Sequence, residues 1–254
     1  MNNGCKNCPA HNSPSIKKLG DDLSDLNYHI ALAGNPNVGK STVFNNLTGL
    51  HQHTGNWPGK TVTRAEGAFE YKNKKFKMID LPGTYSLLST STDEDIARNF
   101  LLFGKPDVTI VVVDATKLER NLNLVLQILE ITPKVVVCLN LIDEAARKNI
   151  IINERQLSKD LGIPVVPTAA RQNIGTDKLI DFTYQVACGE YICKPKKISK
   201  FNKKVQHAID ELTKDVSSLF PKLPNPRWIA MRLLEGDERI IKAIENGELE
   251  ILLS

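Results

Sequence analysis

The sequence lacks any long hydrophobic run. Its longest apolar stretches, such as VTIVVV, are far shorter than the about 20 residues that a membrane-spanning helix needs. The first residues, MNNGCKNCPAHNSP, contain no apolar core of the kind that a secretory signal requires. We therefore expect the chain to be cytosolic or to face the cytosol.

Cysteines are few and odd in number, and charge of neither sign dominates. Five cysteines without a secretory signal argue against a disulfide framework. The net charge of +4 is a mild basic excess, which by itself does not argue for binding to nucleic acid or membrane. A composition of 41% hydrophobic and 24% charged residues is ordinary for a soluble globular protein.

Apolar runs alternate with segments of helical periodicity from residue 28 to about residue 187. HIALA, VTIVVVDA and KVVVCLN are continuous Val/Ile/Leu-rich runs, which is typical of strands buried on both faces. Their alternation with helices predicts an α/β fold around a mostly parallel sheet. The segment GAFEYKNKKFKMID reads as a hairpin, so one edge of the sheet should be antiparallel.

The domain organisation follows from where these patterns begin and end. We expect a flexible polar tail over residues 1–25, a nucleotide-binding domain over 26–190 and a small all-α domain over 191–254. The last region reads as three helices with apolar positions three or four apart. The sequence stops at ILLS soon after the last of them, so we expect an excised fragment with a shortened helical domain.

A phosphate-binding loop stands between the first apolar run and the first helix. GNPNVGKS matches G-x-x-x-x-G-K-[ST], with a strand before it and a helix after it. The glycines permit a tight turn whose N–H groups face an anion, at the positive end of the helix. Lys40 should reach the β- and γ-phosphates, and the Ser41 hydroxyl should bind Mg²⁺. The predicted nucleotide-contacting residues here are Gly34, Asn35, Pro36, Asn37, Val38, Gly39, Lys40, Ser41 and Thr42.

Two further motifs follow strands and favour GTP over ATP. Asp80 in MIDLPG is expected to hold Mg²⁺ through water, and the Gly83 N–H to meet the γ-phosphate. In NLID, Asn140 precedes Asp143, whose carboxylate can accept two hydrogen bonds from the guanine N1 and N2 groups. Adenine offers no such pair, and a mismatch of this kind discriminates by about 10⁴–10⁵.

Three other segments complete the predicted site. The backbone of Ala169 and Ala170 in PTAA could receive the guanine O6. The long stretch HQHTGNWPGKTVTR reads as a first switch, with Trp57 exposed and with Thr61, in preference to Thr63, reaching Mg²⁺ and the γ-phosphate. The second switch would run from residue 81 to about residue 92 and be released when the γ-phosphate leaves.

In this order the motifs resemble one family. GNPNVGKS, NWPGKT, DLPGTYSL, NLID and PRWIAMRLLEGD are similar to the cytosolic N-terminal part of bacterial ferrous iron transport protein B, over about residues 28–245. The resemblance implies a P-loop G domain of the Ras-like or TrmE/Era-like type, followed by a helical domain that acts on nucleotide release. It also implies GTP and GDP as ligands, a membrane permease domain in the same full-length protein, and a place at the cytoplasmic face of the bacterial inner membrane.

The resemblance carries further expectations about catalysis and partners. It implies hydrolysis that is slow and stimulated by K⁺, with Asn37 as a K⁺ ligand; an asparagine that merely tolerates an unusual backbone is the alternative at this position. Thr84 stands where Ras-like enzymes carry a water-orienting Gln. Lys40, Asn37, Thr61 and Gly83 would thus carry catalysis. A homo-oligomer and small accessory proteins are compatible with this assignment.

A different class of protein shares part of this pattern. A soluble K⁺-dependent GTPase of ribosome assembly or RNA modification would have the same phosphate loop with its asparagine. Such a protein should carry an RNA-binding module with a basic, aromatic face. The sequence shows nothing of that kind beyond the lysine-rich run KPKKISKFNKK, so we expect no nucleic-acid partner.

Overall fold

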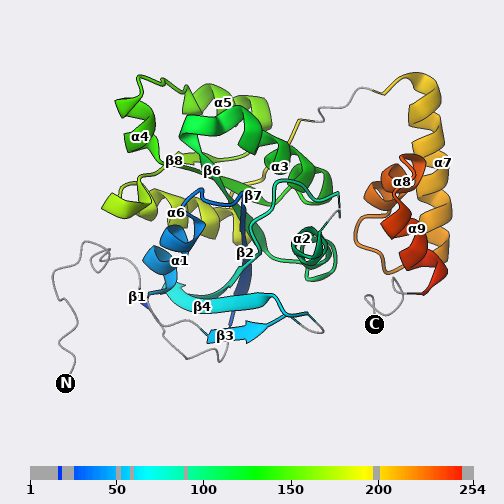
Figure 1. The fold of residues 1–254 in the computed structure, drawn as a ribbon, viewed down its shortest axis with the longest axis horizontal. Helices are drawn as coiled ribbons and strands as arrows, with labels where there is room; N and C mark the ends of the chain where they lie inside the picture. The colour runs from blue at the N-terminus through cyan, green and yellow to red at the C-terminus, as the bar shows by residue number, and fades with distance from the viewer. Residues whose placement is uncertain are drawn as a thin grey trace.

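An eight-stranded sheet organises the larger part of the molecule. The computed structural model describes residues 17–18, 26–49, 53–57, 60–88, 91–196 and 201–247. Within them the strand order is β1-β4-β5-β2-β6-β7-β8, with β3 paired to β4. The expected tail lies outside the described residues except for β1 (Lys17–Lys18), which pairs with β4. Figure 1 shows helices on both sides of the sheet and α7–α9 grouped at one side of the molecule.

The centre of the sheet is parallel, as the apolar runs predict. It consists of β2 (Tyr28–Gly34), β5 (Lys74–Asp80), β6 (Val108–Asp114), β7 (Val135–Asn140) and β8 (Val165–Pro167). Every residue of β6 and β7 is buried. Because the strands run in one direction, their carboxyl ends meet at one edge of the sheet. There Asp80 pairs with Leu32 and Asp114 with Asn140.

The other end of the sheet is antiparallel, which confirms the predicted hairpin. β4 (Thr63–Tyr71) pairs with β5 through the two-residue turn Lys72–Asn73, where both residues have positive φ, 49° and 60°. Such a turn matches the right-handed twist of the strands it joins. β3 (His53–Asn56) lies on the far side of β4.

Helices cover both faces of the sheet because its buried side chains alternate between them. Val111 and Val113 pack with α2 (Thr92–Phe103) and α3 (Leu118–Ile131). Ile110 and Val112 pack with α1 (Lys40–Thr48) and α6 (Thr176–Ala187). The short helices α4 (Ile142–Arg147) and α5 (Glu154–Leu161) extend the first layer through Ala145 and Leu161.

Three helices form the C-terminal unit, as their periodicity predicts. They are α7 (Lys203–Leu219), α8 (Pro226–Leu234) and α9 (Glu238–Glu245), and each begins at a side-chain cap. Trp228 is buried among Val216, Ile229 and Ile240 and forms part of the core of this unit. Leu102 of α2 belongs to the same cluster, so the helical unit packs on the first domain. Among the described residues no helix combines the length and apolar character needed to cross a membrane.

Polar contacts fix the same packing at the end of α3. The Asn225 side chain donates to the carbonyl oxygens of Glu130 and Ile131, at 2.8 and 3.0 Å. The same side chain caps α8 by accepting from the Trp228 N–H at 3.1 Å. The buried Arg232 reaches the Glu130 carboxylate at 3.4 Å. One side chain, Asn225, therefore both starts a helix and anchors the helical unit.

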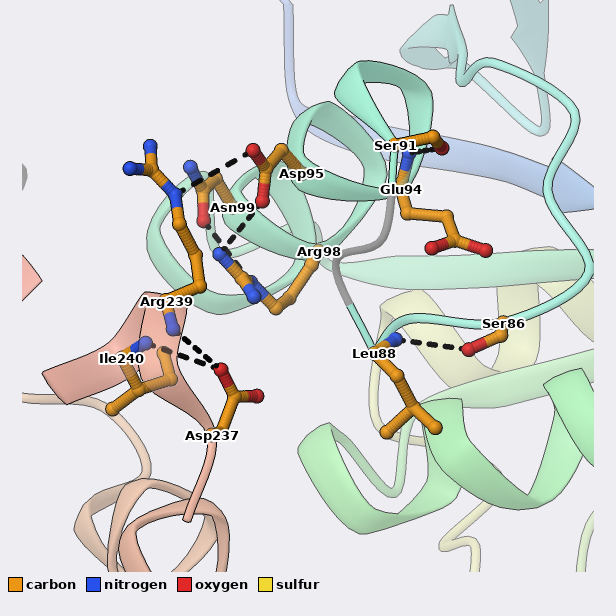
Figure 2. A network of polar contacts seen from close by, with 10 residues as sticks. All are labelled: Ser86, Leu88, Ser91, Glu94, Asp95, Arg98, Asn99, Asp237, Arg239 and Ile240. Carbon is orange, nitrogen blue, oxygen red and sulfur yellow. Dashed lines mark hydrogen bonds and ion pairs between the residues drawn. The ribbon is translucent and has the colours of Figure 1, made fainter. Parts of the chain in front are cut away.

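A second set of polar contacts joins α9 to α2 (Figure 2). Arg239 lies 3.6 Å from Asp95, which also receives a hydrogen bond from the buried Arg98 at 3.1 Å. Asp237 caps α9 by accepting from the backbone N–H groups of Arg239 and Ile240. Since α2 directly follows the predicted second switch, this network connects that segment to the helical unit.

Candidate functional site

The phosphate loop joins β2 to α1, and close packing requires its glycines. A Cβ on Gly34 would lie 2.7 Å from the Val112 carbonyl oxygen, and one on Gly39 would lie 2.4 Å from the Asn140 side-chain nitrogen. Gly39 and Asn37 also have left-handed backbones, with φ of 85° and 66°. The loop therefore has the tight, left-handed turn that a phosphate-binding loop requires. The backbone of Asn37 is compatible both with a ligand role and with a simple turn residue.

Lys40 and Asp80 meet at the carboxyl ends of β2 and β5. The Lys40 Nζ forms an ion pair with Asp80 Oδ1, and both side chains are largely buried. Burial raises the pKa of the Asp80 carboxyl, while the neighbouring Lys40 ammonium opposes that rise. The pair brings together the two residues that the sequence assigned to the phosphates and to Mg²⁺.

The start of the second switch lies against the phosphate loop. The Thr84 N–H donates to the Gly34 carbonyl oxygen at 3.2 Å, and a Cβ on Gly83 would be 3.4 Å from Pro36. Asn35 is buried there, and neither polar atom of its side chain has a hydrogen-bond partner among the residues that the structure describes. Buried amides normally have partners, so this part of the loop fits a site that is completed by a bound group.

The end of the second switch is tied to α3. The Leu87 N–H donates to the Gln127 side chain at 2.7 Å. The Leu88 N–H donates to Ser86 Oγ at 2.9 Å (Figure 2). Thr84 and Leu87 thus tie this segment to the phosphate loop and to α3 through bonds that the motifs did not single out.

Asn140 holds the phosphate loop and the PTAA turn together. Its Nδ2 donates to the Val38 carbonyl oxygen at 2.9 Å. Its Oδ1 accepts from the Ala170 N–H at 3.0 Å and from the Thr168 hydroxyl at 3.3 Å. The structure therefore joins three motifs that lie up to 132 residues apart in sequence, from Val38 to Ala170. Thr168 was missed because a threonine at the end of a strand has no distinctive spacing.

The predicted guanine contacts are engaged with protein groups. Asp143 accepts hydrogen bonds from Arg147 and Gln172, both at 3.2 Å. The Ala169 N–H donates to the Ile174 carbonyl oxygen at 3.1 Å, and the Ala170 N–H to Asn140. A guanine base would therefore have to displace or share these bonds.

Two adjoining cavities follow the same edge of the sheet. One of about 510 Å³ is lined by the phosphate loop and Gly83. The other, of about 320 Å³, runs toward the PTAA turn. The first is lined by Asn35, Pro36, Asn37, Gly39, Lys40, Ser41, Thr42 and Gly83. The second is lined by Asn37, Gly39, Thr42, Asp114, Thr116, Lys117, Asn140, Leu141, Glu144, Lys148, Ala170 and Arg171. Because they share three residues, one elongated ligand could occupy both.

The first switch differs from its expected form at Trp57. This side chain is buried, not exposed, because it packs edge-on against Phe100 of α2 and under the Arg64 guanidinium. Within the described part of the chain, its indole N–H has no hydrogen-bond partner. Thr61 is exposed and lines neither cavity. The expectation of an exposed tryptophan is therefore wrong, since a bulky ring finds apolar neighbours on α2 that the loop sequence does not reveal.

The fold and the site define a P-loop G domain followed by a helical domain. The family model of ferrous iron transport protein B matches residues 28–183, and that of the FeoB cytosolic helical domain matches residues 201–253. The chain belongs to the ferrous iron transport protein B (FeoB) family.

Curated relatives and solved structures agree with this membership. The chain is 41% identical over 213 residues to the Fe(2+) transporter FeoB of Escherichia coli (strain K12), which covers 82% of the chain and 27% of the relative. It is 41% identical over 216 residues to a Fe(2+) transport protein A/Fe(2+) transporter FeoB fusion protein of Porphyromonas gingivalis, covering 83% of the chain and 25% of that protein. The chain thus spans about a quarter of the length of these relatives.

Solved cytosolic domains of the family share this fold over most of the chain. The GDP form II of the T. maritima FeoB cytosolic domain has a TM-score of 0.76 at 39% identity, covering 85% of this chain and 84% of that one. The GMPPNP form of the same domain has a TM-score of 0.73 at 38% identity, with the same coverage of each chain.

Proposed function

We propose that the chain is the GTP-binding and GTP-hydrolysing module of a bacterial Fe²⁺ transporter, and that it regulates or drives ferrous iron uptake through changes in its switch loops. The observation that carries the proposal is the convergence of the phosphate loop, Asn140 and the PTAA turn along two adjoining cavities, with Asp80 paired to Lys40 at the same edge of the sheet. The relatives solved with GDP and GMPPNP support a guanine nucleotide as the ligand.

Guanine is selected at the PTAA end of the site. Asp143 accepts from the base N1 and N2 groups after giving up Gln172 and Arg147, which already place two N–H donors on its carboxylate. Guanine therefore replaces two N–H donors by two others, whereas adenine would leave the carboxylate without donors. Asn140 and the backbone of Ala169 and Ala170 form the rest of the base site.

The phosphates lie at the loop end of the site. Lys40 leaves Asp80 to bind the β- and γ-phosphates, with the loop N–H groups around it. Ser41, Thr61 and Asp80 supply the hydroxyl and carboxylate oxygens that Mg²⁺ prefers. Mg²⁺ bound there neutralises phosphate charge, and K⁺ held through Asn37 would add positive charge where other enzymes use an arginine.

Hydrolysis is slow in this proposal because the position after D-x-x-G carries Thr84 and not a water-orienting Gln. Thr84 follows the D-x-x-G motif, and its N–H is bonded to Gly34. The Gly83 N–H and the switch backbone remain to position the γ-phosphate and water. Movement of Thr61 and of residues 81–92 on hydrolysis would be passed to α2 and the helical unit.

In the full-length protein this module would lie at the cytoplasmic face of the inner membrane, joined to a permease domain. The fusion protein of Porphyromonas gingivalis supports a small accessory protein as a partner of the family. Family membership of both domains leaves the soluble RNA-linked GTPase without a supporting observation.

The test is the rate of phosphate release from GTP and from ATP, in K⁺ and in Na⁺, with and without Mg²⁺. We expect hydrolysis of GTP alone, faster in K⁺ than in Na⁺ and lost without Mg²⁺. Equal rates with ATP would overturn the guanine assignment.

An immunoblot of fractionated source cells tests whether the chain is part of a membrane transporter. A band well above 28.3 kDa in the membrane fraction supports this proposal, and a soluble band of that mass contradicts it.

A further inference from the structure

The PTAA turn is held by a residue of α1 that no motif includes. The Asn46 side chain is buried, and its Nδ2 donates to the Ala170 carbonyl oxygen at 2.6 Å. The two residues lie 124 positions apart in sequence. This bond was invisible to sequence reasoning because Asn46 reads simply as one polar residue within a helix.

Ala170 is bonded at both ends. Its N–H donates to Asn140 Oδ1 at 3.0 Å, while its carbonyl oxygen accepts from Asn46 and from the Asn173 N–H at 3.1 Å. Bonds at both its N–H and its carbonyl leave the residue little freedom to turn. The direction of the Ala170 N–H, the predicted donor to guanine O6, therefore depends in part on Asn46.

One rigid element thus reaches both ends of the site. α1 begins at Lys40 and Ser41, which face the phosphates, and carries Asn46 nearly two turns later. At about 1.5 Å per residue, Lys40 and Asn46 are about 9 Å apart along the helix axis. In the proposed function, α1 therefore binds the phosphates at its N-terminus and also fixes the position of the Ala170 turn that contacts the base.

We propose that Asn46 is a positioning residue for guanine recognition: it holds the Ala170 turn at the distance from the phosphate loop at which the turn meets the O6 edge of the base. This inference rests on the proposed function of the site. It assigns to this chain a determinant of base selectivity that lies outside the guanine motifs.

The test compares two nucleotides that differ at O6. Dissociation rates are measured for GDP and for 6-thioguanosine 5′-diphosphate, which keeps the N1–H and the 2-amino group but carries sulfur, a weaker hydrogen-bond acceptor, in place of O6. In Asn46→Ala we expect GDP to dissociate about three- to tenfold faster, the range for loss of one hydrogen bond. The 6-thio analogue, whose sulfur accepts a hydrogen bond only weakly at this position, should change by less than twofold.

A matched control comes from the same helix. Thr48 is equally buried, but its hydroxyl bonds to the Phe44 carbonyl oxygen of its own helix, at 2.8 Å. Thr48→Val should therefore lower the melting temperature without changing the ratio of the two dissociation rates. Asn46→Leu, which keeps the branching at Cγ and leaves no cavity, should repeat the effect of Asn46→Ala and so exclude a cavity as its cause.

The outcomes separate this inference from the function on which it rests. Dissociation rates do not depend on the folded fraction of a preparation, so partial unfolding of a variant does not obscure the ratio. If wild-type protein holds GDP no better than ADP, the guanine site itself is refuted. If wild-type protein prefers GDP but Asn46→Ala changes both rates equally, or changes neither, then Asn46 has no positioning role.

Discussion

The Lys40 ammonium is paired with the Asp80 carboxylate where β2 and β5 end side by side. Each group is the partner that neutralises the other while both are largely buried. In the proposed function, a nucleotide with Mg²⁺ would offer each of them a new partner of opposite charge. The ion pair would then keep the two charges in place until the ligand binds.

This pair predicts how stability changes with pH. Burial raises the pKa of Asp80 above its ordinary value of 3.8. A raised pKa in the folded state means that the carboxyl contributes stability below pH 3.8 and loses it as pH rises through the folded-state pKa. We compare the melting temperatures of the wild type and of Asp80→Asn. As pH rises from about 3.5 to 7, we expect the wild type to lose stability relative to Asp80→Asn. A constant difference over that range would contradict the raised pKa.

Asp143 predicts an exchange of base specificity. Asp143→Asn replaces an acceptor-only group by one that donates and accepts, which fits the N1–H and O2 of xanthine. We expect GDP affinity to fall by about 10²-fold or more, and xanthosine diphosphate to bind better than GDP. Gln172→Ala is the control, because it removes only a donor that guanine replaces. Unchanged GDP affinity in Asp143→Asn would refute the base assignment.

The sequence predicted the elements of this site better than it predicted their contacts. Strand ends and loops follow from local patterns, so the sequence alone could place Lys40 and Asp80 at one edge of the sheet. The burial of Trp57 could not be predicted in this way. It depends on contact with Phe100, which lies 43 residues away in the sequence and meets Trp57 only once the chain has folded. The same holds for Asn46, whose partner is the backbone of a distant turn. A backbone partner leaves no mark on the sequence pattern.

Asn225 predicts a stability effect at the junction with the helical unit. Asn225→Ala loses both a helix cap and two hydrogen bonds to the end of α3. We expect a loss of about 2–3 kcal/mol in the free energy of unfolding, measured in urea. Asn202→Ala is the matched control, because Asn202 caps α7 through the Val205 N–H. It should cost only about 1 kcal/mol; equal losses would mean that the contacts with α3 contribute nothing.

Trp57 predicts a fluorescence signal from the first switch. The segment closes on itself through the Trp57 N–H to Val62 oxygen bond at 3.0 Å and the Lys60 N–H to Trp57 oxygen bond at 2.9 Å. Thr61 lies within this turn and lines neither cavity, so we expect the turn to open and Trp57 to leave Phe100 when Thr61 binds Mg²⁺. In Trp228→Phe, where Trp57 is the remaining tryptophan, we expect red-shifted emission with GMPPNP and Mg²⁺ but not with GDP. Emission that stays constant with both nucleotides would show that Thr61 is not the Mg²⁺ ligand.

Asn37 predicts a separation between K⁺ use and nucleotide binding. Its left-handed backbone (φ 66°) can be kept by glycine, whereas its side chain is needed only if it binds a cation. Asn37→Gly should therefore bind GTP with nearly wild-type affinity but hydrolyse it at the same rate in K⁺ and in Na⁺. Asn37→Asp keeps an oxygen at the position and should retain part of the stimulation. If Asn37→Gly kept the full preference for K⁺, the asparagine would be a turn residue, and the cation would have to be held by backbone oxygens alone.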